Sequence, residues 1–310
     1  MKKYFKKISP KEFDSPEKYP ASNEELEKWQ SANKDFWEST PMRYDWNDDN
    51  PHEELSPKFY NEIDKRFFGE IKAVMPWNKI PFDNLIDFKN LKHKTILEIG
   101  VGTGVHADLI APYSKAFIGI DITDYAVKTT SKRMKIRCPK ANYKIIKMNA
   151  ENLEFNDNYF DLVWSWGVIH HSANTKNIID EIVRVLKVNG TAQIMVYHRG
   201  WWNYYIIGFL FHGILRAGFL KHKSLSNVVQ ANTDGFIARY YSRKSFASIL
   251  DNNKTDIKKI IISGNRGDVI PVSGRNLRKR FIKVMPGQIF RFFLTRLRMG
   301  SLLIIEFKKK

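Results

Sequence analysis

Residues 95–104 read TILEIGVGTG, a short apolar run that passes directly into three alternating glycines. The run Thr95–Ile99 predicts a buried strand, and Gly100, Gly102 and Gly104 predict a sharp turn whose main chain lies open to a ligand. The helix expected after this turn would direct its unpaired N–H groups at a negatively charged group. A glycine-rich turn that only joins a strand to a helix remains the alternative for this loop taken alone.

The spacing of the glycines narrows the choice of ligand. The third glycine comes two residues after the second, which departs from a dinucleotide fingerprint, and no Lys-Ser/Thr pair ends the loop as in phosphate-binding ATPases. A nucleoside pocket without a pyrophosphate remains. The next predicted strand ends at Asp121, whose carboxylate can accept both ribose hydroxyls, unless it only caps the following helix. Asn149-Ala150-Glu151 follows the third strand, where an amide or backbone N–H can bond an adenine edge.

Short apolar runs recur along the chain after Thr95, separated by longer amphipathic stretches. This rhythm is typical of a parallel sheet with crossover helices. It predicts an α/β fold with a Rossmann-like, doubly wound, seven-stranded and mostly parallel sheet. The expected strands are Thr95–Ile99, Ala116–Asp121, Tyr143–Met148, Phe160–Trp166, Gly190–Tyr197, Asp256–Ser263 and Ser301–Phe307.

Two helices are predicted ahead of the sheet. Ser22 and Glu25 have the spacing of a capping box, and Ser56-Pro57 marks the start of a second helix that runs through Ile71. We therefore expect residues 1–90 to form an N-terminal helical lid and residues 91–310 to form the sheet domain. The connection 199–253 is too long for a single helix, and the connection 264–300 is too long for the hairpin expected between the last two strands. Both are predicted to be insertions.

Five blocks of sequence follow one another in a characteristic order. They are Leu97–Gly104, Gly119–Asp121, Asn149–Phe155, Phe160–His171 and Glu181–Gly190. Together they resemble class I S-adenosylmethionine-dependent methyltransferases, specifically the ubiquinone/menaquinone-biosynthesis-like group of the methyltransferase domain 11 type. The resemblance covers about residues 90–197, a third of the chain. It implies that residues 91–310 are a methyltransferase domain and that S-adenosyl-L-methionine is the cofactor.

The resemblance also implies roles for matched residues. The glycines would pass under the methionine part of the cofactor, with Glu98 near its amino group, Asp121 at the ribose and Asn149 with Ala150 at the adenine. The expected cofactor contacts are Glu98, Gly100, Gly102, Thr103, Gly104, Asp121, Ile122, Asn149, Ala150, Glu151 and Trp166. Asn149 stands where the family often has Asp, which should weaken adenine selectivity slightly. Val188-Asn189-Gly190 replaces the usual Pro-Gly-Gly turn and should affect only a loop.

Methyl transfer from a sulfonium is an in-line displacement, so alignment and desolvation of the acceptor supply much of the rate. A base is needed only when the acceptor holds its proton tightly. The candidates are His170 and His171 after the fourth strand and Tyr197 and His198 at the end of the fifth, with a purely structural role as the alternative. No Asn-Pro-Pro-Tyr or Asp-Pro-Pro-Tyr set follows the fourth strand, which disfavours nucleic-acid amino groups. An acceptor that reacts readily, such as a thiol, phenol, enol or carboxylate, is expected.

Aromatic residues provide candidate contacts for that acceptor. Tyr44 and Trp46 lie in a turn that can close over it, although an aromatic turn packed on the sheet is the alternative. Trp201 and Trp202 open the first insertion, where an apolar stretch extends to Leu220. A membrane-surface helix pair or an apolar lid suits this stretch, a buried core helix is the alternative, and a membrane span is disfavoured because it would interrupt one sheet.

The net charge of +18 is concentrated at one end of the chain, since residues 199–310 hold 22 Lys/Arg against 5 Asp/Glu. This asymmetry predicts a polyanionic partner. Both insertions are apolar as well as basic, which favours an anionic membrane surface over nucleic acid. The expected function is methylation of a small or amphipathic acceptor, which is a thiol, a phenol, a quinone or a lipid-like molecule. An RNA methyltransferase and a non-catalytic protein that binds the cofactor are the alternatives.

The single cysteine, Cys138, excludes an internal disulfide and a cysteine metal cluster, and a buried, inert thiol is expected. No metal site is predicted. The charged segment Met1–Pro10 lacks the apolar run of a secretory signal. These features predict a cytoplasmic protein that associates peripherally with the inner face of the membrane through its insertions.

Overall fold

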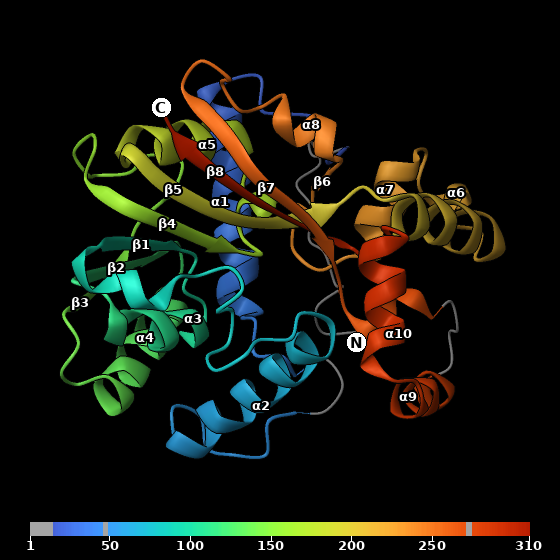
Figure 1. Ribbon diagram of the computed structural model, residues 1–310. Helices are drawn as coiled ribbons and strands as arrows, with labels where there is room; N and C mark the ends of the chain where they lie inside the picture. The colour runs from blue at the N-terminus through green and yellow to red at the C-terminus, as the bar shows by residue number, and fades with distance from the viewer. Residues whose placement is uncertain (1–14, 46–48, 271–274) are drawn as a thin grey trace.

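The computed structural model describes residues 15–45, 49–270 and 275–310, with the main chain alone for 275–279. One sheet crosses the molecule in the order β3-β2-β1-β4-β5-β8-β7 (Figure 1). Neighbouring strands from β3 to β5 are parallel, whereas β8 lies antiparallel between β5 and β7. The predicted α/β architecture is confirmed. The main strands are β1 (Thr95–Ile99), β2 (Ala116–Asp121), β3 (Tyr143–Lys147), β4 (Phe160–Trp166), β5 (Leu186–His198), β7 (Thr255–Ser263) and β8 (Leu302–Lys309).

Two details of the sheet differ from the prediction. A short eighth strand, β6 (Tyr240–Tyr241), pairs with the end of β5 in parallel. Strand β5 begins at Leu186, four residues before the expected start, because residues 188–190 form an irregular part of the strand and not a loop. Asn189 has a positive φ of 63°, and the pairing of β5 with β4 shifts register nearby.

Helices cover both faces of the sheet. Side chains of α2 and α3 pack with Ile96 and Trp164 on one face, and those of α5 and α8 pack with Leu97 and Val163 on the other. Alternation of side chains along each strand produces these two cores. The helices outside the insertions are α1 (Asn23–Ser39), α2 (Pro57–Val74), α3 (Val105–Ile110), α4 (Asp124–Arg137) and α5 (Thr175–Val185), with short 3₁₀ turns η2 (Phe88–His93), η3 (Ala111–Tyr113) and η4 (Ile169–His171).

Helix α1 is fixed at the end of the sheet where the parallel strands finish. Its N-cap is Ser22, whose side chain accepts from the Glu25 N–H at 3.2 Å, as the sequence predicts. At its other end, Glu38 accepts from the backbone N–H groups of Asp124 and Tyr125 at 2.8 and 3.0 Å. The helix therefore lies beside the loop that follows β2.

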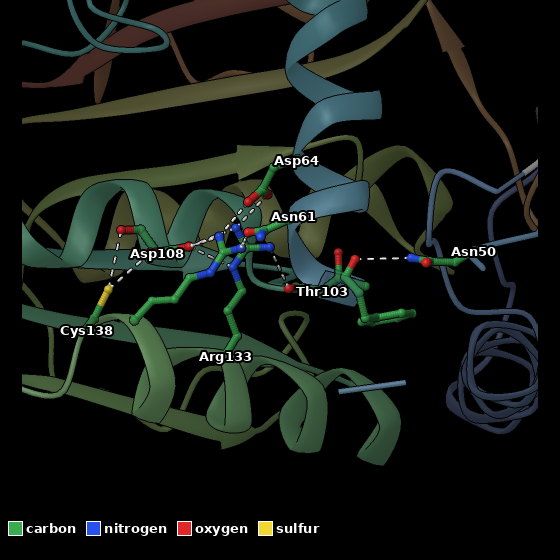
Figure 2. Close-up of polar contacts among 9 residues, drawn as sticks. Asn50, Asn61, Asp64, Thr103, Asp108, Arg133 and Cys138 are labelled. Atoms are coloured by element: carbon green, nitrogen blue, oxygen red, sulfur yellow. Dashed lines mark hydrogen bonds and ion pairs between the residues drawn. The ribbon is translucent and has the colours of Figure 1, made fainter. Parts of the chain in front are cut away.

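Helix α2 is tied to the sheet domain by a network of charges (Figure 2). The guanidinium of Arg133, on α4, is almost fully buried and lies 2.6 Å from Asp64 on α2 and 2.8 Å from Asp108 on α3. Arg137 bridges the same two carboxylates at 2.5 and 2.7 Å. Cys138 contacts Asp108 at 3.2 Å, and burial raises the pKa of its thiol to about 12, which leaves the thiol protonated and unreactive.

Asp64→Asn should reduce the free energy of unfolding by about 2 kcal/mol, because it removes a charged partner from buried Arg133. The matched control is Asp180→Asn, which disrupts the exposed Lys176–Asp180 pair on α5 and should change stability by less than about 0.5 kcal/mol. Urea denaturation followed by circular dichroism measures both. Equal effects of the two substitutions would contradict a structural role for this network.

The two late insertions form separate helical layers at one end of the sheet. The first contains a π-helix, η5 (Trp201–Leu215), followed by α6 (Gly218–Lys221), α7 (Leu225–Ala231) and α8 (Arg243–Ala247). Ala217 adopts a left-handed φ of 54° after the end of the π-helix, so the apolar stretch through Leu220 is divided between η5 and α6. The second contains η6 (Arg266–Val269), α9 (Arg275–Val284), α10 (Gly287–Arg291) and η7 (Phe292–Arg296). In residues 15–45, 49–270 and 275–310, no helix combines the length and apolar character that a membrane span requires.

Candidate active site

The glycine loop after β1 borders a large cavity. Gly100, Gly102 and Gly104 have positive φ values of 80°, 53° and 78°. A Cβ atom on Gly100 would lie 2.2 Å from the Val168 side chain, so this position accepts only glycine. A Cβ atom on Gly102 would meet no atom within 4 Å, since this residue faces the open cavity. Gly100, Gly102 and Thr103 line the cavity and Gly104 does not, so the loop exposes its main chain to the cavity from Gly100 to Thr103.

Asp121 is held against this loop at the end of β2. One carboxylate oxygen accepts from the Thr123 N–H and hydroxyl at 3.0 and 2.9 Å, and the other accepts from the Gly102 N–H at 3.1 Å. The helix that follows is capped by the Thr123 side chain, so capping does not account for Asp121. Burial raises the pKa of Asp121, although these hydrogen bonds oppose the rise. Asp121 and Ile122 both line the cavity.

Asn149 and Ala150 line the same cavity after β3. The Asn149 side-chain oxygen accepts from Gln30 on α1 at 2.9 Å and from the Glu151 N–H at 3.1 Å. Glu151 itself lies outside the cavity lining, where it accepts from the Asn174 N–H at 2.8 Å and burial raises its pKa to about 7. Gln30 is a cavity residue that the sequence did not predict, because nothing local connects a residue of α1 with β3.

Glu98 lies inside β1, beside Gly119 and Trp164 of the neighbouring strands. Its carboxyl is almost fully buried, and its Oε2 has no hydrogen-bond partner among the described residues. Burial raises its pKa well above the usual range, and the nearby Asp121 charge adds to this rise. A buried, unpaired carboxyl is costly, and a cationic ligand group close to it would reduce that cost. Glu98 is not among the residues that line the cavity, so the contact with the cofactor's amino group that the resemblance implies stays a prediction.

The four candidate bases divide into two groups. His171 and Tyr197 line the cavity, whereas His170 and His198 do not. His170 is fully buried beneath the Tyr197 ring, 4.0 Å between centroids, and burial lowers its pKa well below the usual range. His198 is also buried, with Nδ1 bonded to the Gly300 carbonyl at 2.8 Å. Only His171 and Tyr197 are therefore placed to contact an acceptor in the cavity.

His171 and Tyr197 have defined hydrogen-bond partners. Nδ1 of His171 lies 2.5 Å from the Ile237 carbonyl, and since a carbonyl only accepts, this nitrogen carries the proton and Nε2 carries the lone pair. The Tyr197 hydroxyl donates to Asp234 at 2.5 Å. Asp234 comes from the first insertion and also lines the cavity. It is the only acidic residue in positions 199–250, a signal that sequence analysis did not use.

The aromatic candidates are also divided. Tyr44 lines the cavity and packs against Phe67 with centroids 5.0 Å apart, and Trp166 lines it from the end of β4. Trp46 lies outside the described residues. Trp201 and Trp202 do not line the cavity, because their indole N–H groups donate to the carbonyls of Leu297 and Asp268 in the other insertion, at 2.9 and 2.8 Å. The two indoles thus join the first insertion to the second, and they do not make the predicted contact with the acceptor cavity.

His106 is a further cavity residue that sequence analysis missed. Its ring is 7% exposed and lies among Phe67, Phe82, Trp164 and Trp166. Neither ring nitrogen has a hydrogen-bond partner in the part of the chain described, and burial lowers its pKa to about 3. The imidazole is therefore neutral at physiological pH and adds a polar edge to an otherwise aromatic wall.

The cavity has a volume of about 1200 Å³ and extends from the glycine loop to the insertions. A single drug-sized ligand occupies a pocket of roughly 300–1,000 Å³, so there is room for two molecules. One end is lined by Gly102, Asp121 and Asn149, and the other by side chains of η5 and by Asp234. Among the described residues, no group of three or more metal-ligating side chains is placed to hold an ion.

Comparisons with known proteins agree with this geometry. Residues 97–194 match the family described as "Methyltransferase domain", which confirms the resemblance inferred from the sequence blocks. An uncharacterized methyltransferase, YcgJ of Bacillus subtilis, is 32% identical over 31% of this chain and 37% of its own length. A ubiquinone biosynthesis O-methyltransferase of Bartonella tribocorum is 29% identical over 52% of this chain and 66% of its own. The chain thus spans less than two thirds of the length of these relatives.

The fold also has a solved counterpart. A chain from the complex of the Haloferax volcanii Trm112 methyltransferase activator is 12% identical, with a TM-score of 0.50. The comparison covers 86% of this chain and 97% of that chain. Residues 97–194 thus match a methyltransferase domain and form part of a Rossmann-like α/β fold.

Proposed function

We propose that this protein transfers a methyl group from S-adenosylmethionine to a small or amphipathic acceptor bound in the same cavity. The observation that carries the proposal is the Asp121 carboxylate, which is hydrogen-bonded to the exposed main chain of the glycine loop inside a matched methyltransferase domain. Similarity to a ubiquinone biosynthesis O-methyltransferase supports an acceptor of the quinone or lipid-like class.

Residues of three strand ends would hold the cofactor. Asp121 would accept the ribose hydroxyls, Asn149 and Ala150 would contact the adenine, and the main chain at Gly102 would leave space for the methionine part. The buried Glu98 carboxyl lies outside the cavity lining, and we infer that the cationic amino group binds on the cavity side of it. When bound, S-adenosylmethionine supplies an electrophilic methyl group on a sulfonium. The chain's own contribution is to fix the acceptor in line and to exclude water.

The acceptor's proton would be taken up at the Tyr197–Asp234 pair. A carboxylate has about four lone-pair sites, of which the Tyr197 hydroxyl uses one, so Asp234 retains the capacity to accept a hydrogen bond from an acceptor hydroxyl or thiol. The surrounding wall contains Trp166, Met195 and Ile207, which suits an acceptor with an apolar body. A phenol, thiol or related amphipathic molecule matches both properties.

The first test of the function is calorimetry with S-adenosylmethionine and its demethylated product. Heat of binding to one site per chain is expected, and its absence for both compounds overturns the proposal. Labelled cofactor is then incubated with protein and cell extract, and the products are separated into volatile, lipid, aqueous and macromolecular fractions. Label in the volatile, lipid or small aqueous fraction supports the proposal. Label in RNA, or binding without any product, favours the alternatives.

Asp234→Asn should lower the rate of methyl transfer to the identified acceptor at least about 100-fold. A general base typically contributes a factor of about this size to the rate. Asp251→Asn, a partly exposed carboxylate of the same insertion, is the matched control and should retain turnover. His170→Ala should also retain turnover because His170 does not reach the cavity, whereas His171→Ala tests the second candidate base. Normal turnover of Asp234→Asn would exclude this carboxylate from the reaction.

A further inference from the structure

The insertions expose an unusual amount of apolar surface. In the described part of the chain, 13 of the 18 exposed large hydrophobic side chains lie in residues 201–220 and 281–297. We call these two segments the apolar face. Leu215, Leu220 and Val284 are aliphatic and 68%, 88% and 81% exposed. Exposed apolar side chains gathered in this way mark an interaction surface, whereas single ones elsewhere need no explanation.

The two segments are held together by hydrogen bonds at the start of η5. The Trp201 indole donates to the Leu297 carbonyl at 2.9 Å, and the Asn203 amide donates to the Met299 carbonyl at 2.5 Å. Figure 1 shows α6 and α7 and, below them, α9 and α10 on the same side of the sheet. The two parts of the apolar face therefore lie on insertions that are joined where η5 begins.

The charge of the apolar face selects its partner. Residues 201–233 and 275–300 contain no Asp or Glu. Lys221, Lys223, Arg280, Lys283 and Arg296 are exposed among the apolar side chains. Basic residues beside exposed aliphatic side chains suit an anionic lipid surface. The apolar face exposes five aromatic rings on which bases can stack, but its three most exposed apolar side chains, Leu215, Leu220 and Val284, are aliphatic and favour lipid over RNA. A second copy of this face would bring like charges together.

The inner sides of the same elements line the cavity. Ile207 and Phe211 of η5, Arg216 at its C-terminal end and Ile282 of α9 all border it. The elements that expose apolar groups outward thus also enclose the acceptor end of the proposed active site. A hydrophobic molecule moving from a membrane into this cavity would remain between apolar side chains along its path.

We propose that the apolar face binds the surface of an anionic bilayer and that the acceptor enters the cavity from that bilayer, between η5 and α9. This inference rests on the proposed function, since it names the source and class of the acceptor: an amphipathic lipid-like molecule. The protein would lie on the surface without crossing it, with the cavity opening toward the lipid headgroups.

Flotation of the purified full chain with vesicles tests the inference. The chain should float with vesicles of phosphatidylcholine and phosphatidylglycerol at 7:3, and at least tenfold less with phosphatidylcholine alone. Leu215→Glu/Leu220→Glu should reduce flotation with the anionic vesicles at least tenfold. The double substitution removes two exposed aliphatic side chains from the apolar face and replaces them with carboxylates. The matched control is Tyr159→Glu/Val188→Glu, which changes two exposed apolar residues near the opposite ends of the strands.

Calorimetry on the same proteins separates this inference from the proposed function. If the parent chain binds S-adenosylmethionine but does not float, the membrane inference is wrong and the function stands. Flotation without cofactor binding supports the surface and overturns the function. The inference is also overturned if the two double variants lose flotation equally. It is likewise overturned if the parent chain does not float but gives a salt-sensitive gel shift with RNA.

Discussion

Asp121→Ala should weaken binding of S-adenosylmethionine at least about 100-fold, a loss of about 3 kcal/mol or more. The carboxylate lies at the edge of the cavity and is already oriented by the N–H groups of Gly102 and Thr123. In the proposed binding mode, its replacement removes two charge-assisted hydrogen bonds to ribose hydroxyls, each about 1.5–3 kcal/mol, and it also removes the carboxylate that holds the Gly102 N–H. Isothermal titration calorimetry measures the change.

Asp124→Ala provides the control for this substitution. Asp124 lies three residues later, its side chain is 68% exposed, and it pairs with Lys147. We expect unchanged cofactor affinity, because this pair is at the surface. Thermal melting of both variants verifies that each protein is folded. If Asp121→Ala does not fold, Asp121→Asn is used in its place, since its side-chain oxygen still accepts a hydrogen bond. Normal affinity in a folded Asp121 variant would place the ribose elsewhere.

Gly102→Ala should cause a second large loss of cofactor affinity, at least about tenfold, while the protein remains folded. The added methyl group would meet no protein atom, so its effect on packing is small. At φ 53° an alanine costs about 1–2 kcal/mol of stability. The methyl group would instead project into the part of the cavity where we propose that the methionine part of the cofactor binds.

Gly69→Ala is the matched control, since a Cβ at Gly69 also meets nothing within 4 Å. Gly69 is in the middle of α2, where alanine is the better helix former and should raise stability by about 0.5–1 kcal/mol. Cofactor affinity should stay at the parent value. Calorimetry and urea denaturation of the two variants thus separate a local steric block from a general loss of stability. Unchanged affinity of Gly102→Ala would contradict the predicted path of the cofactor.

The sequence predicted the sheet well because its signals are local. The strand Thr95–Ile99, the alternating glycines and the caps Ser22 and Ser56 each depend on a few neighbouring residues, and the structure confirms them. The final acid of β2, Asp121, was identified for the same reason, since a strand end fixes its place in space.

The acceptor end of the cavity was predicted less well, because it is assembled from distant segments. Asp234 meets Tyr197 across 37 residues, and Gln30 meets Asn149 across 119. Trp201 and Trp202 carry the aromatic signal of an acceptor site, yet their rings are directed to the other insertion. The break at Ala217 depends on a backbone conformation that its side chain does not favour, and no local pattern predicts it.

Strand β8 has a consequence for how the molecule is assembled during synthesis. It comes last in sequence, yet it separates β5 from β7 and pairs with both. Until the ribosome has released residues 302–309, the hydrogen-bonding edges of β5 and β7 lack their common neighbour. Such non-local pairing makes folding slow, so chaperone binding is expected at these two strands while translation is still in progress.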